Sequence, residues 1–444
     1  MMTESQKPAE YICPARERLS ALFDDGVFTE TGSGRSAGVV TAYGYINGVP
    51  AYAFSQDKTA DSGAVSRAHA EKVCRMFDLA AKNGVPVVGI YDSCGAFIED
   101  GADALNAYSA MLLEAGNLSG VVPTVSVIAG VCAGSMAVLA AAADYVVMTE
   151  SAELYVTAGG ESGAAAAAKS GVVTAVSEND AAAMESVRKY LSLMPQNNLS
   201  PLPEFEFDAP AIASFDNGEN SISSIADNGS VLELYSDFGK ASMTALCTVG
   251  GTTAGIAALN KTSDKLTADD CAKLAGFVRL CDAFSVPVIT IVDTEGFDMN
   301  GTGAVRAAAR LSGAYAEATC AKVALVSGKA CGAAFIAFAG KNAAADQVFA
   351  LPEAVIAPVE PITAAEFLYH DKLKGAADLA AERNNLAAEY SKNEASAFAA
   401  AEKGAVDEAV TAESARSAVM GVLEITAGKR LNKRLPKKHS VLPL

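Results

Sequence analysis

The sequence has no tryptophan, only three histidines, and charged side chains at just 19% of its 444 positions. The histidines are His69, His370 and His439, and none lies in a glycine-rich turn. No G-x-S-x-G or H-E-x-x-H motif occurs, so the sequence gives little support to serine hydrolase or zinc hydrolase chemistry. A strand followed by G-x-G-x-x-G is also missing, which argues against a nicotinamide-binding fold. We interpret His69 as a residue on the surface of a helix.

The nine cysteines include no C-x-x-C pair. Most of them stand inside apolar runs, as Cys132 and Cys331 do, which indicates buried free thiols rather than a disulfide framework or a zinc site. The first 19 residues contain no apolar segment of the kind found in signal peptides. The sequence therefore predicts a cytoplasmic protein without a bound metal.

Acidic residues outnumber basic ones, and the formal net charge is -18. This balance argues against nucleic acid as a partner. One basic run, residues 428–439, is interpreted as a solvated tail rather than a membrane or nucleic-acid tag. The uncharged stretch 121–143 is long enough to cross a bilayer, but its proline, glycines and serines favour a buried strand followed by a buried helix.

Half of the chain is hydrophobic, and the chain is built from one unit used twice. Residues 72–97 match residues 273–297 with a constant offset of 201, which pairs Asp92 with Asp293. The segment VIAGVCAGSMAV, 127–138, matches LVSGKACGAAFI, 325–336, with an offset of 198. Agreement in order, spacing and residue type indicates an internal duplication.

Each half alternates helical patterns with continuous apolar runs of strand length, which predicts a mainly parallel α/β sheet. Proline, asparagine and acidic residues from 194 onward mark the boundary between the halves. We expect an N-terminal domain at 1–200, a linker at 201–224 and a C-terminal domain at 225–444.

The glycine-rich turns are the candidate site. We expect a strand to end at Gly130, the chain to turn at 132–134, and a helix to start at Ser135, where free backbone N–H groups point beyond the strand. A second turn, Ser93 to Ala96, follows another strand of the same half. Two such turns facing each other offer two N–H donors to one oxygen, as in an oxyanion hole. Asp92 and Asp293 end strands, where capping the turn is commoner than catalysis.

Several long segments give the chain a family resemblance. They are ARERLSALFDDGVF (15–28), VVTAYGYINGVPAYAFSQD (39–57), RAHAEKVCRMFDLA (67–80), LSLMPQNN (191–198), FVRLCDAFSVPVITIVDTEGF (277–297), AYAEATCAKV (314–323) and KKHSVLPL (437–444). Nearly end to end, the chain resembles the carboxyltransferase subunits of biotin-dependent acyl-CoA carboxylases, methylmalonyl-CoA decarboxylases and transcarboxylase.

The resemblance implies two tandem crotonase-like domains and carboxyl transfer between carboxybiotin and the alpha carbon of a short acyl-CoA, through enolates. It assigns the first oxyanion hole to Gly134 and Ser135, facing Cys94, Gly95 and Ala96. It assigns the second to Gly332, Ala333 and Ala334, facing Gly296 and Phe297. The implied partners are a biotin carboxyl carrier protein and a biotin carboxylase subunit, and the implied assembly is a homohexamer with coenzyme A thioesters as substrates.

The chain differs from the family pattern at four places. Phe97 stands where an arginine is usual, Glu295 where a proline is usual, and Ile336 where an aspartate is common. The segment after Thr157 is shorter than in relatives. We expect Cys94, Phe97 and Ile336 to contact substrate, with Ile336 widening the choice of acyl chain.

Three functions stay open on sequence grounds. The first is a carboxyltransferase subunit of an acyl-CoA carboxylase. The second is the same chemistry run as decarboxylation with a sodium-pumping membrane partner, and the third is an inactive scaffold that binds acyl-CoA. A hydratase or isomerase is disfavoured because the duplication would have no use.

Overall fold

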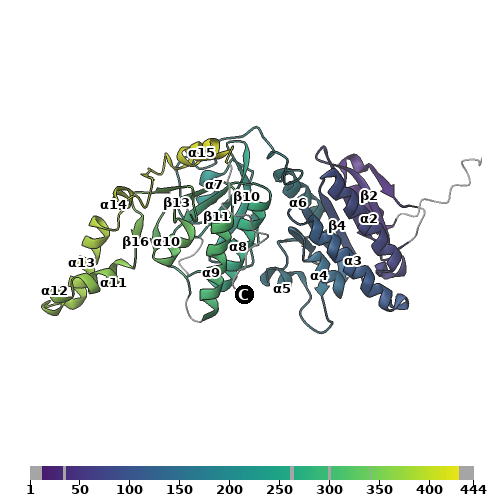
Figure 1. Ribbon diagram of the computed structural model, residues 1–444, viewed down its shortest axis with the longest axis horizontal. Coiled ribbons are helices and arrows are strands. Elements are labelled where there is room, and N and C mark those ends of the chain that lie inside the picture. Colours follow the sequence, from purple (N-terminus) through teal and green to yellow (C-terminus); the bar gives the residue numbers. More distant parts are fainter. Residues whose placement is uncertain (1–12, 34–36, 261–264, 299–301, 342, 430–444) are drawn as a thin grey trace, which may run out of the picture. The chain divides into compact units, whose positions relative to one another are not determined.

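The computed structural model describes residues 13–33, 37–260, 265–298, 302–341 and 343–429. Most of the basic run, His439 and the matching tail 437–444 lie outside the described residues, as does the start of the N-terminal segment. The chain divides into two compact units, Met1–Pro201 and Leu202–Leu444 (Figure 1).

The first unit is a mixed sheet with helices on both faces. Its strands are β1 Phe28–Thr31, β2 Val39–Ile46, β3 Val49–Gln56, β4 Val87–Ser93, β5 Thr124–Ala133, β6 Tyr145–Thr149, β7 Glu153–Tyr155 and β8 Ala175–Ser177. Within the described residues the sheet order is β1-β2-β3-β4-β5-β6-β8, and β7 pairs with β5. The β1–β3 meander is antiparallel, and every later pairing is parallel. This confirms the expectation of a mainly parallel sheet.

The helices of the first unit cover the sheet with apolar stripes. They are α1 Pro14–Leu22, α2 Arg67–Asn83, α3 Ala102–Leu118, α4 Ser135–Ala140, α5 Ala164–Lys169 and α6 Asp180–Leu193, with single 3₁₀ turns at Asp24–Gly26, Asp61–Gly63 and Ile98–Asp100. Helices α2 and α3 bury Met76, Phe77 and Met111 in one core with Tyr91 and Ile128 of the strands. The uncharged stretch 121–143 forms β5 and α4, as expected, and no described helix has the length and hydropathy needed to cross a membrane.

The second unit repeats this plan. Its strands are β9 Leu232–Leu234, β10 Met243–Val249, β11 Thr252–Ala258, β12 Val288–Val292, β13 Lys322–Val326, β14 Lys329–Cys331, β15 Gln347–Ala350, β16 Val355–Ala357 and β17 Glu408–Ala409. Among the described residues the main sheet runs β17-β15-β13-β12-β11-β10-β9, and β14 pairs with β16 in a separate small sheet. The β9–β11 meander is antiparallel, and the remaining pairs are parallel, as in the first unit.

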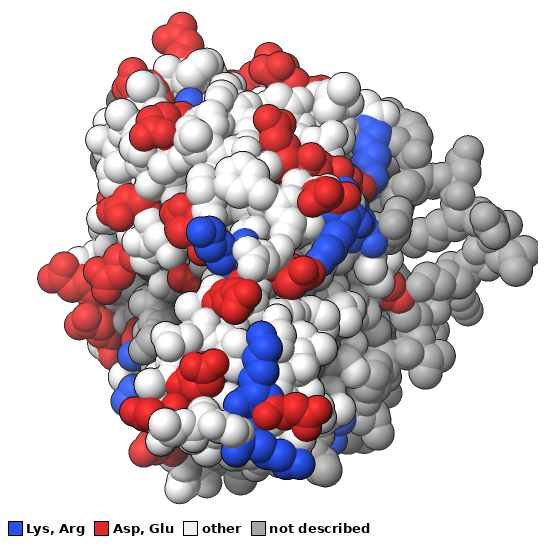
Figure 2. All heavy atoms as spheres, turned by 90° about the vertical axis from the view of Figure 1, so that its left-hand side faces the viewer, with Lys and Arg blue, Asp and Glu red and all other residues white. Residues whose placement is uncertain are grey.

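The helices of this unit are α7 Ser221–Ile225, α8 Ala268–Ala283, α9 Thr302–Glu317, α10 Ala333–Phe338, α11 Pro361–Leu368, α12 His370–Lys374, α13 Leu379–Asn393, α14 Ala397–Glu402 and α15 Ala415–Thr426. Helices α11 to α13 form an arm that extends from the sheet of this unit (Figure 1). On the face that includes the arm, acidic and basic side chains are interspersed rather than gathered by sign (Figure 2).

All but the first residue of the segment expected to be a linker, 201–224, is part of the second unit. The N–H of Phe205 donates to the carbonyl of Gly251, and the N–H of Phe215 donates to the carbonyl of Ala412. Residues from Ser221 onward form α7, whose Ile222 and Ile225 are buried in the core of the unit. Hydrogen bonds to distant residues, which the composition does not reveal, hold this segment against the sheet.

Candidate active site

Each unit has two glycines four residues apart, and each glycine is required for a different reason. A Cβ at Gly130 would lie 2.2 Å from the carboxylate of Asp92, and a Cβ at Gly328 would lie 2.2 Å from that of Asp293. The later glycines, Gly134 and Gly332, precede α4 and α10 with φ angles of 66° and 55°, a conformation that favours glycine. Strand β5 continues through Gly130 to Ala133, past the end that the sequence suggests.

Asp92 holds the first site together through buried charge. Its Oδ2 accepts a hydrogen bond from Arg18 Nη1 at 2.9 Å, and both side chains are almost fully buried. The same guanidinium donates to the carbonyl of Ala129 at 3.1 Å and to Asp180 at 2.8 Å. Because Asp92 is the next-to-last residue of β4 and Ala129 lies on β5, Arg18 fixes the two strands that lead into the two turns. Asp92 is thus an anchor in the structure.

Asp293 has the same place in the second unit, with neutral partners. Its carboxylate accepts from the N–H of Lys329 at 2.8 Å and from the side-chain amide of Asn217 at 2.8 Å. The Asn217 carbonyl oxygen in turn accepts from the hydroxyl of Ser327 at 2.9 Å. Asp293 therefore also anchors its turn.

In the first unit two of the four expected donors are already used. The N–H of Gly95 donates to Ser93 Oγ at 3.1 Å, and the N–H of Gly134 donates to the carbonyl of Tyr155 at 2.9 Å. The N–H groups of Ala96 and Ser135 donate to no other described residue. A Cβ on Gly95 would lie 3.6 Å from the carbonyl of Ala133, so the two turns are adjacent. Of the four expected donors, the N–H groups of Ala96 and Ser135 are therefore free, whereas those of Gly95 and Gly134 have acceptors within the chain.

The second unit repeats this arrangement at matching positions. The N–H of Gly296 donates to Thr294 Oγ1 at 3.2 Å, and the N–H of Gly332 donates to the carbonyl of Ala357 at 2.9 Å. Within the described part of the chain, the N–H groups of Phe297 and Ala333 again have no acceptor. The N–H groups of Gly296 and Gly332 thus also have acceptors within the chain, and each unit presents one equivalent pair of free N–H groups.

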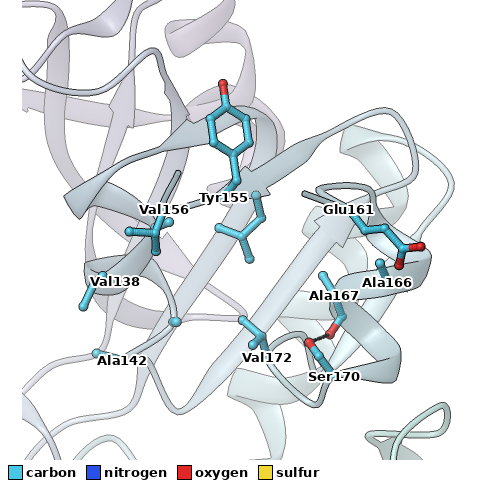
Figure 3. A pocket seen from close by; sticks show the side chains of 12 residues that line it. Val138, Ala142, Tyr155, Val156, Glu161, Ala166, Ala167, Ser170 and Val172 are labelled. Atoms are coloured by element: carbon cyan, nitrogen blue, oxygen red, sulfur yellow. Dashed lines mark hydrogen bonds between the residues drawn. The ribbon is translucent and has the colours of Figure 1, made fainter. Parts of the chain in front are cut away.

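The first unit also contains a cavity of about 580 Å³, which neither Ala96 nor Ser135 lines. It lies between α4, β7 and α5, and Val138, Val156 and Val172 contribute to its wall (Figure 3). Tyr155, whose carbonyl holds the Gly134 N–H, also lines it. Glu161 is the only carboxylate among the lining residues. The cavity thus has apolar walls with almost no acid–base groups, and Tyr155 connects it to the turn that precedes α4.

The carboxyl transferase domain family matches residues 14–442 of this chain. The methylmalonyl-CoA decarboxylase subunit alpha of Propionigenium modestum is 35% identical, with 97% of this chain and 93% of that protein covered. The propionyl-CoA carboxylase beta chain of Cereibacter sphaeroides is 34% identical with the same coverage. The crystal structure of transcarboxylase 12S superimposes with a TM-score of 0.89 at 32% identity, covering 97% of this chain and 92% of that one.

The chain belongs to the carboxyl transferase family. This confirms the resemblance, the fold class and the prediction of a carboxyltransferase.

Three further residues that we expected at the site of this carboxyl transferase, Cys94, Phe97 and Phe297, differ in exposure and in hydrogen bonding. The thiol of Cys94 is exposed, and its N–H donates to the carbonyl of Ser62. The N–H of Phe97 donates to Val65, so its backbone is not free. The side chain of Phe297 is buried and stacks on Phe338 at 5.9 Å between ring centroids.

Residues on α10 behave differently from one another. The methyl group of Ala334 is buried, whereas the side chain of Ile336 is 66% exposed on the outer face of the helix. The side chain of Ile336 is therefore open to solvent within its own unit, and its contact with substrate stays a prediction.

The buried thiols and the buried histidine of the carboxyl transferase have strongly shifted pKa values. Burial raises the pKa of Cys132 to about 12 and that of Cys331 to about 11, so neither supplies a thiolate at neutral pH. His69 is fully buried, and burial lowers its pKa to about 3. The prediction of a surface histidine is therefore wrong. Among the described residues no cluster of three or more His, Cys, Asp or Glu side chains is arranged to hold a metal.

Sequence reasoning did not find Arg18, Ser93 or Tyr155. Ser93 and Thr294 carried a usable signal, because both are hydroxyl residues at positions related by the offset of 201. Tyr155 acts through its carbonyl oxygen, which the identity of a residue does not reveal. The cavity depends on how α5 packs, and the run of alanines in this helix does not reveal where it packs.

Proposed function

We propose that this chain transfers a carboxyl group between carboxybiotin on a separate carrier protein and the alpha carbon of a short acyl-CoA, such as propionyl-CoA or acetyl-CoA. The observation that carries the proposal is the duplicated pair of free N–H groups, Ala96 with Ser135 and Phe297 with Ala333. Each pair is suited to one oxygen that gains negative charge. A reaction between two substrates that both develop an enolate-like oxygen needs two such pairs.

The first pair fits the thioester. With the thioester oxygen accepting from the N–H groups of Ala96 and Ser135, negative charge on that oxygen is stabilised as the alpha carbon loses its proton or its carboxyl group. One such donor contributes about 10²–10³ to the rate of comparable enzymes. Carboxybiotin, when bound, supplies a carboxyl group activated for transfer. The second pair offers equivalent stabilisation to an oxygen of the other substrate.

The cavity between α4, β7 and α5 of the same unit supports this assignment. The lining side chains are almost all apolar, with Glu161 as the one carboxylate. Fixed backbone donors need no reorganisation during the reaction, and apolar walls strengthen their electrostatic effect. The described residues fit enolate stabilisation better than general acid–base catalysis.

The test is an assay of the full chain with free biotin and methylmalonyl-CoA or malonyl-CoA. We expect loss of carboxylated thioester that depends on both biotin and protein. Binding of the thioester without any transfer would indicate the scaffold function instead.

A second candidate is the decarboxylating direction in a complex with a membrane subunit. The 35% identity to a methylmalonyl-CoA decarboxylase subunit alpha supports it. The chemistry at the two pairs of N–H groups is the same in both directions. Co-purification from the native membrane in detergent distinguishes them: a polytopic partner supports decarboxylation, and a biotin carboxylase subunit supports carboxylation in the cytoplasm.

We further propose that the chain assembles as a homohexamer. The structure of transcarboxylase 12S, which covers 97% of this chain, is described as a hexamer assembly. On the arm of the second unit, Phe367 and Leu368 are 81% and 63% exposed, which is typical of a surface that another chain covers. Sedimentation of the wild type and of Phe367→Asp tests this: a hexamer that dissociates in the variant supports the proposal, and an active monomer overturns it.

A further inference from the structure

One side-chain amide links the strands that lead into the turns of the second unit. We propose that Asn217 is a positioning residue for carboxyl transfer, because it fixes the segments that carry the N–H groups of Phe297 and Ala333. This inference rests on the proposed function, since it assumes that these two N–H groups act on a reacting oxygen.

Helices α1 and α7 have equivalent places in the two units. After α1, Oδ2 of Asp24 accepts a hydrogen bond from the N–H of Gly48 at 2.8 Å. After α7, Oδ2 of Asp227 accepts one from the N–H of Gly251 at 2.8 Å. Both pairs of positions differ by 203 residues, so the duplication includes these two helices.

Under this offset, Ser221 on α7 takes the place of Arg18 on α1. A serine is too short to join two strands as the guanidinium of Arg18 does. The hydroxyl of Ser221 instead donates to Oδ1 of Asn260 at 3.1 Å, and Nδ2 of Asn260 donates to Oδ1 of Asn217. The second unit therefore uses side-chain amides where the first uses a guanidinium.

The amide of Asn217 joins the two strands that lead into the turns. Its Nδ2 donates to Asp293, directly after β12, at 2.8 Å. Its Oδ1 accepts from the hydroxyl of Ser327, directly after β13, at 2.9 Å. At the offsets of 201 and 198, these two positions correspond to the residues of β4 and β5 that Arg18 joins in the first unit. One neutral side chain thus has the bridging role of the guanidinium.

The link continues from Asn217 to both donors. Asp293 directly precedes the turn that ends at Phe297. Its Oδ1 also accepts from the N–H of Lys329 at 2.8 Å, on the short strand β14 that leads to Ala333. Without the amide, the separation of the two donors is held by fewer bonds. A misplacement of about 1 Å costs about 10²-fold in rate.

Asn217 lies at the surface, and two of its partners are buried. Its side chain is exposed, whereas Ser327 and Asn260 belong to the buried polar residues. The charged side chains beside the link, Lys329 and Glu295, pair with each other at 2.6 Å. A substitution at Asn217 therefore changes the link without opening a cavity in the core.

The experiment measures kcat and KM for carboxyl transfer from methylmalonyl-CoA to free biotin between pH 6 and pH 8. In Asn217→Asp a carboxylate faces that of Asp293, and we expect kcat at pH 8 to fall by about 10²-fold relative to the wild type. At lower pH the two carboxylates share a proton, which restores a donor, so the deficit should shrink by about threefold or more. The KM for methylmalonyl-CoA should change by less than about twofold, because the first pair of donors is in the other unit.

Asn220→Asp is the matched control. Nδ2 of Asn220 donates to Asp216 at 2.7 Å, and both residues are exposed in the same segment. The substitution creates a similar pair of carboxylates outside the link, so kcat should stay within about twofold of the wild type. Ser327→Ala removes only the hydroxyl that donates to Asn217, and it should lower kcat by about two- to tenfold.

Each outcome decides between the claims. A kcat of Asn217→Asp within about threefold of the wild type at pH 8, or an equal loss in Asn220→Asp, overturns the inference and leaves the proposed function standing. A loss that is the same at every pH indicates damage to the fold and also overturns it. If Asn217→Asp does not fold, an unchanged kcat in Ser327→Ala overturns it. No transfer by the wild type contradicts the proposed function itself.

Discussion

The two units keep the same backbone hydrogen bonds and differ in the side chains around them. In both, a hydroxyl residue ends the strand region and holds a glycine N–H, through Ser93 in one and Thr294 in the other. In both, the glycine before the short helix donates to a distant carbonyl. These bonds leave the next N–H group free in each turn, so duplication has preserved the donors.

The side chains around the turns differ between the two units. Cys94 and Val131 of the first unit correspond to Glu295 and Lys329 of the second, and these two form an ion pair at 2.6 Å. This pairing raises the pKa of Lys329, so the amine stays charged. An apolar cavity lies between α4, β7 and α5 of the first unit, and the turns of the second unit carry an ion pair. We expect the turns of the two units to serve two different ligands.

The largest difference between the two units is expected in how much the partners of Asp92 and Asp293 contribute to the free energy of unfolding. Arg18→Met leaves the carboxylate of Asp92 buried without its main cation, and we expect a loss of about 3–5 kcal/mol in the free energy of unfolding. Asn217→Ala removes a neutral partner from Asp293 and should cost about 1–3 kcal/mol. Urea denaturation of both variants measures the difference. Equal losses would show that charge does not distinguish the anchors.

Acid should destabilise the first unit through His69. Its pKa is about 3 in the folded protein and about 6.5 when unfolded. Below pH 6.5 the unfolded chain binds a proton that the folded chain does not, so stability falls as the pH drops toward 3, by about 1.4 kcal/mol per unit. The second unit has Asp270 at the matching position, bonded to Ser242 and Thr267.

Unfolding free energies at pH 7 and pH 5.5 measure this effect. His69→Gln should reduce the difference between the two pH values by about 1 kcal/mol, because only about one pH unit of the interval lies below 6.5. The exposed His370 provides the control, because His370→Gln should leave the difference unchanged. The same pH dependence in wild type and His69→Gln would refute the assignment.

The smallest effect is expected when the side chains that differ between the turns of the two units are exchanged. The double variant Glu295→Cys with Lys329→Val gives the second turn the side chains of the first. Because the ion pair is half exposed, its removal should change stability by less than about 1 kcal/mol. We expect about a threefold change in KM for free biotin and none for methylmalonyl-CoA. A change confined to the thioester would reverse our assignment of ligands to turns.

The repeat, the glycine-rich turns and the start of α4 at Ser135 could be predicted from the sequence, because they depend on local spacing and on glycine. Which backbone N–H groups remain free could not be predicted from the sequence. The Gly95 and Gly134 N–H groups are bound by Ser93 Oγ and the Tyr155 carbonyl, and the second contact comes from a separate strand. The pattern of α2 likewise did not show that His69 is buried, with its Nε2 3.5 Å from the side chain of Gln56 at the end of β3.

The central claim is that the backbone N–H groups of Ser135 and Ala333 stabilise charge in the reaction. Ser135 and Ala333 are each the first residue of a helix, where proline is well tolerated and removes only the N–H. The direct measurement is kcat for carboxyl transfer in Ser135→Pro and Ala333→Pro, with Ser135→Ala and Ala333→Ser as controls. We predict a fall of about 10²–10³ in each proline variant and less than about twofold in each control. Near-normal kcat in a folded Ser135→Pro, or a large loss in Ser135→Ala, would contradict the account.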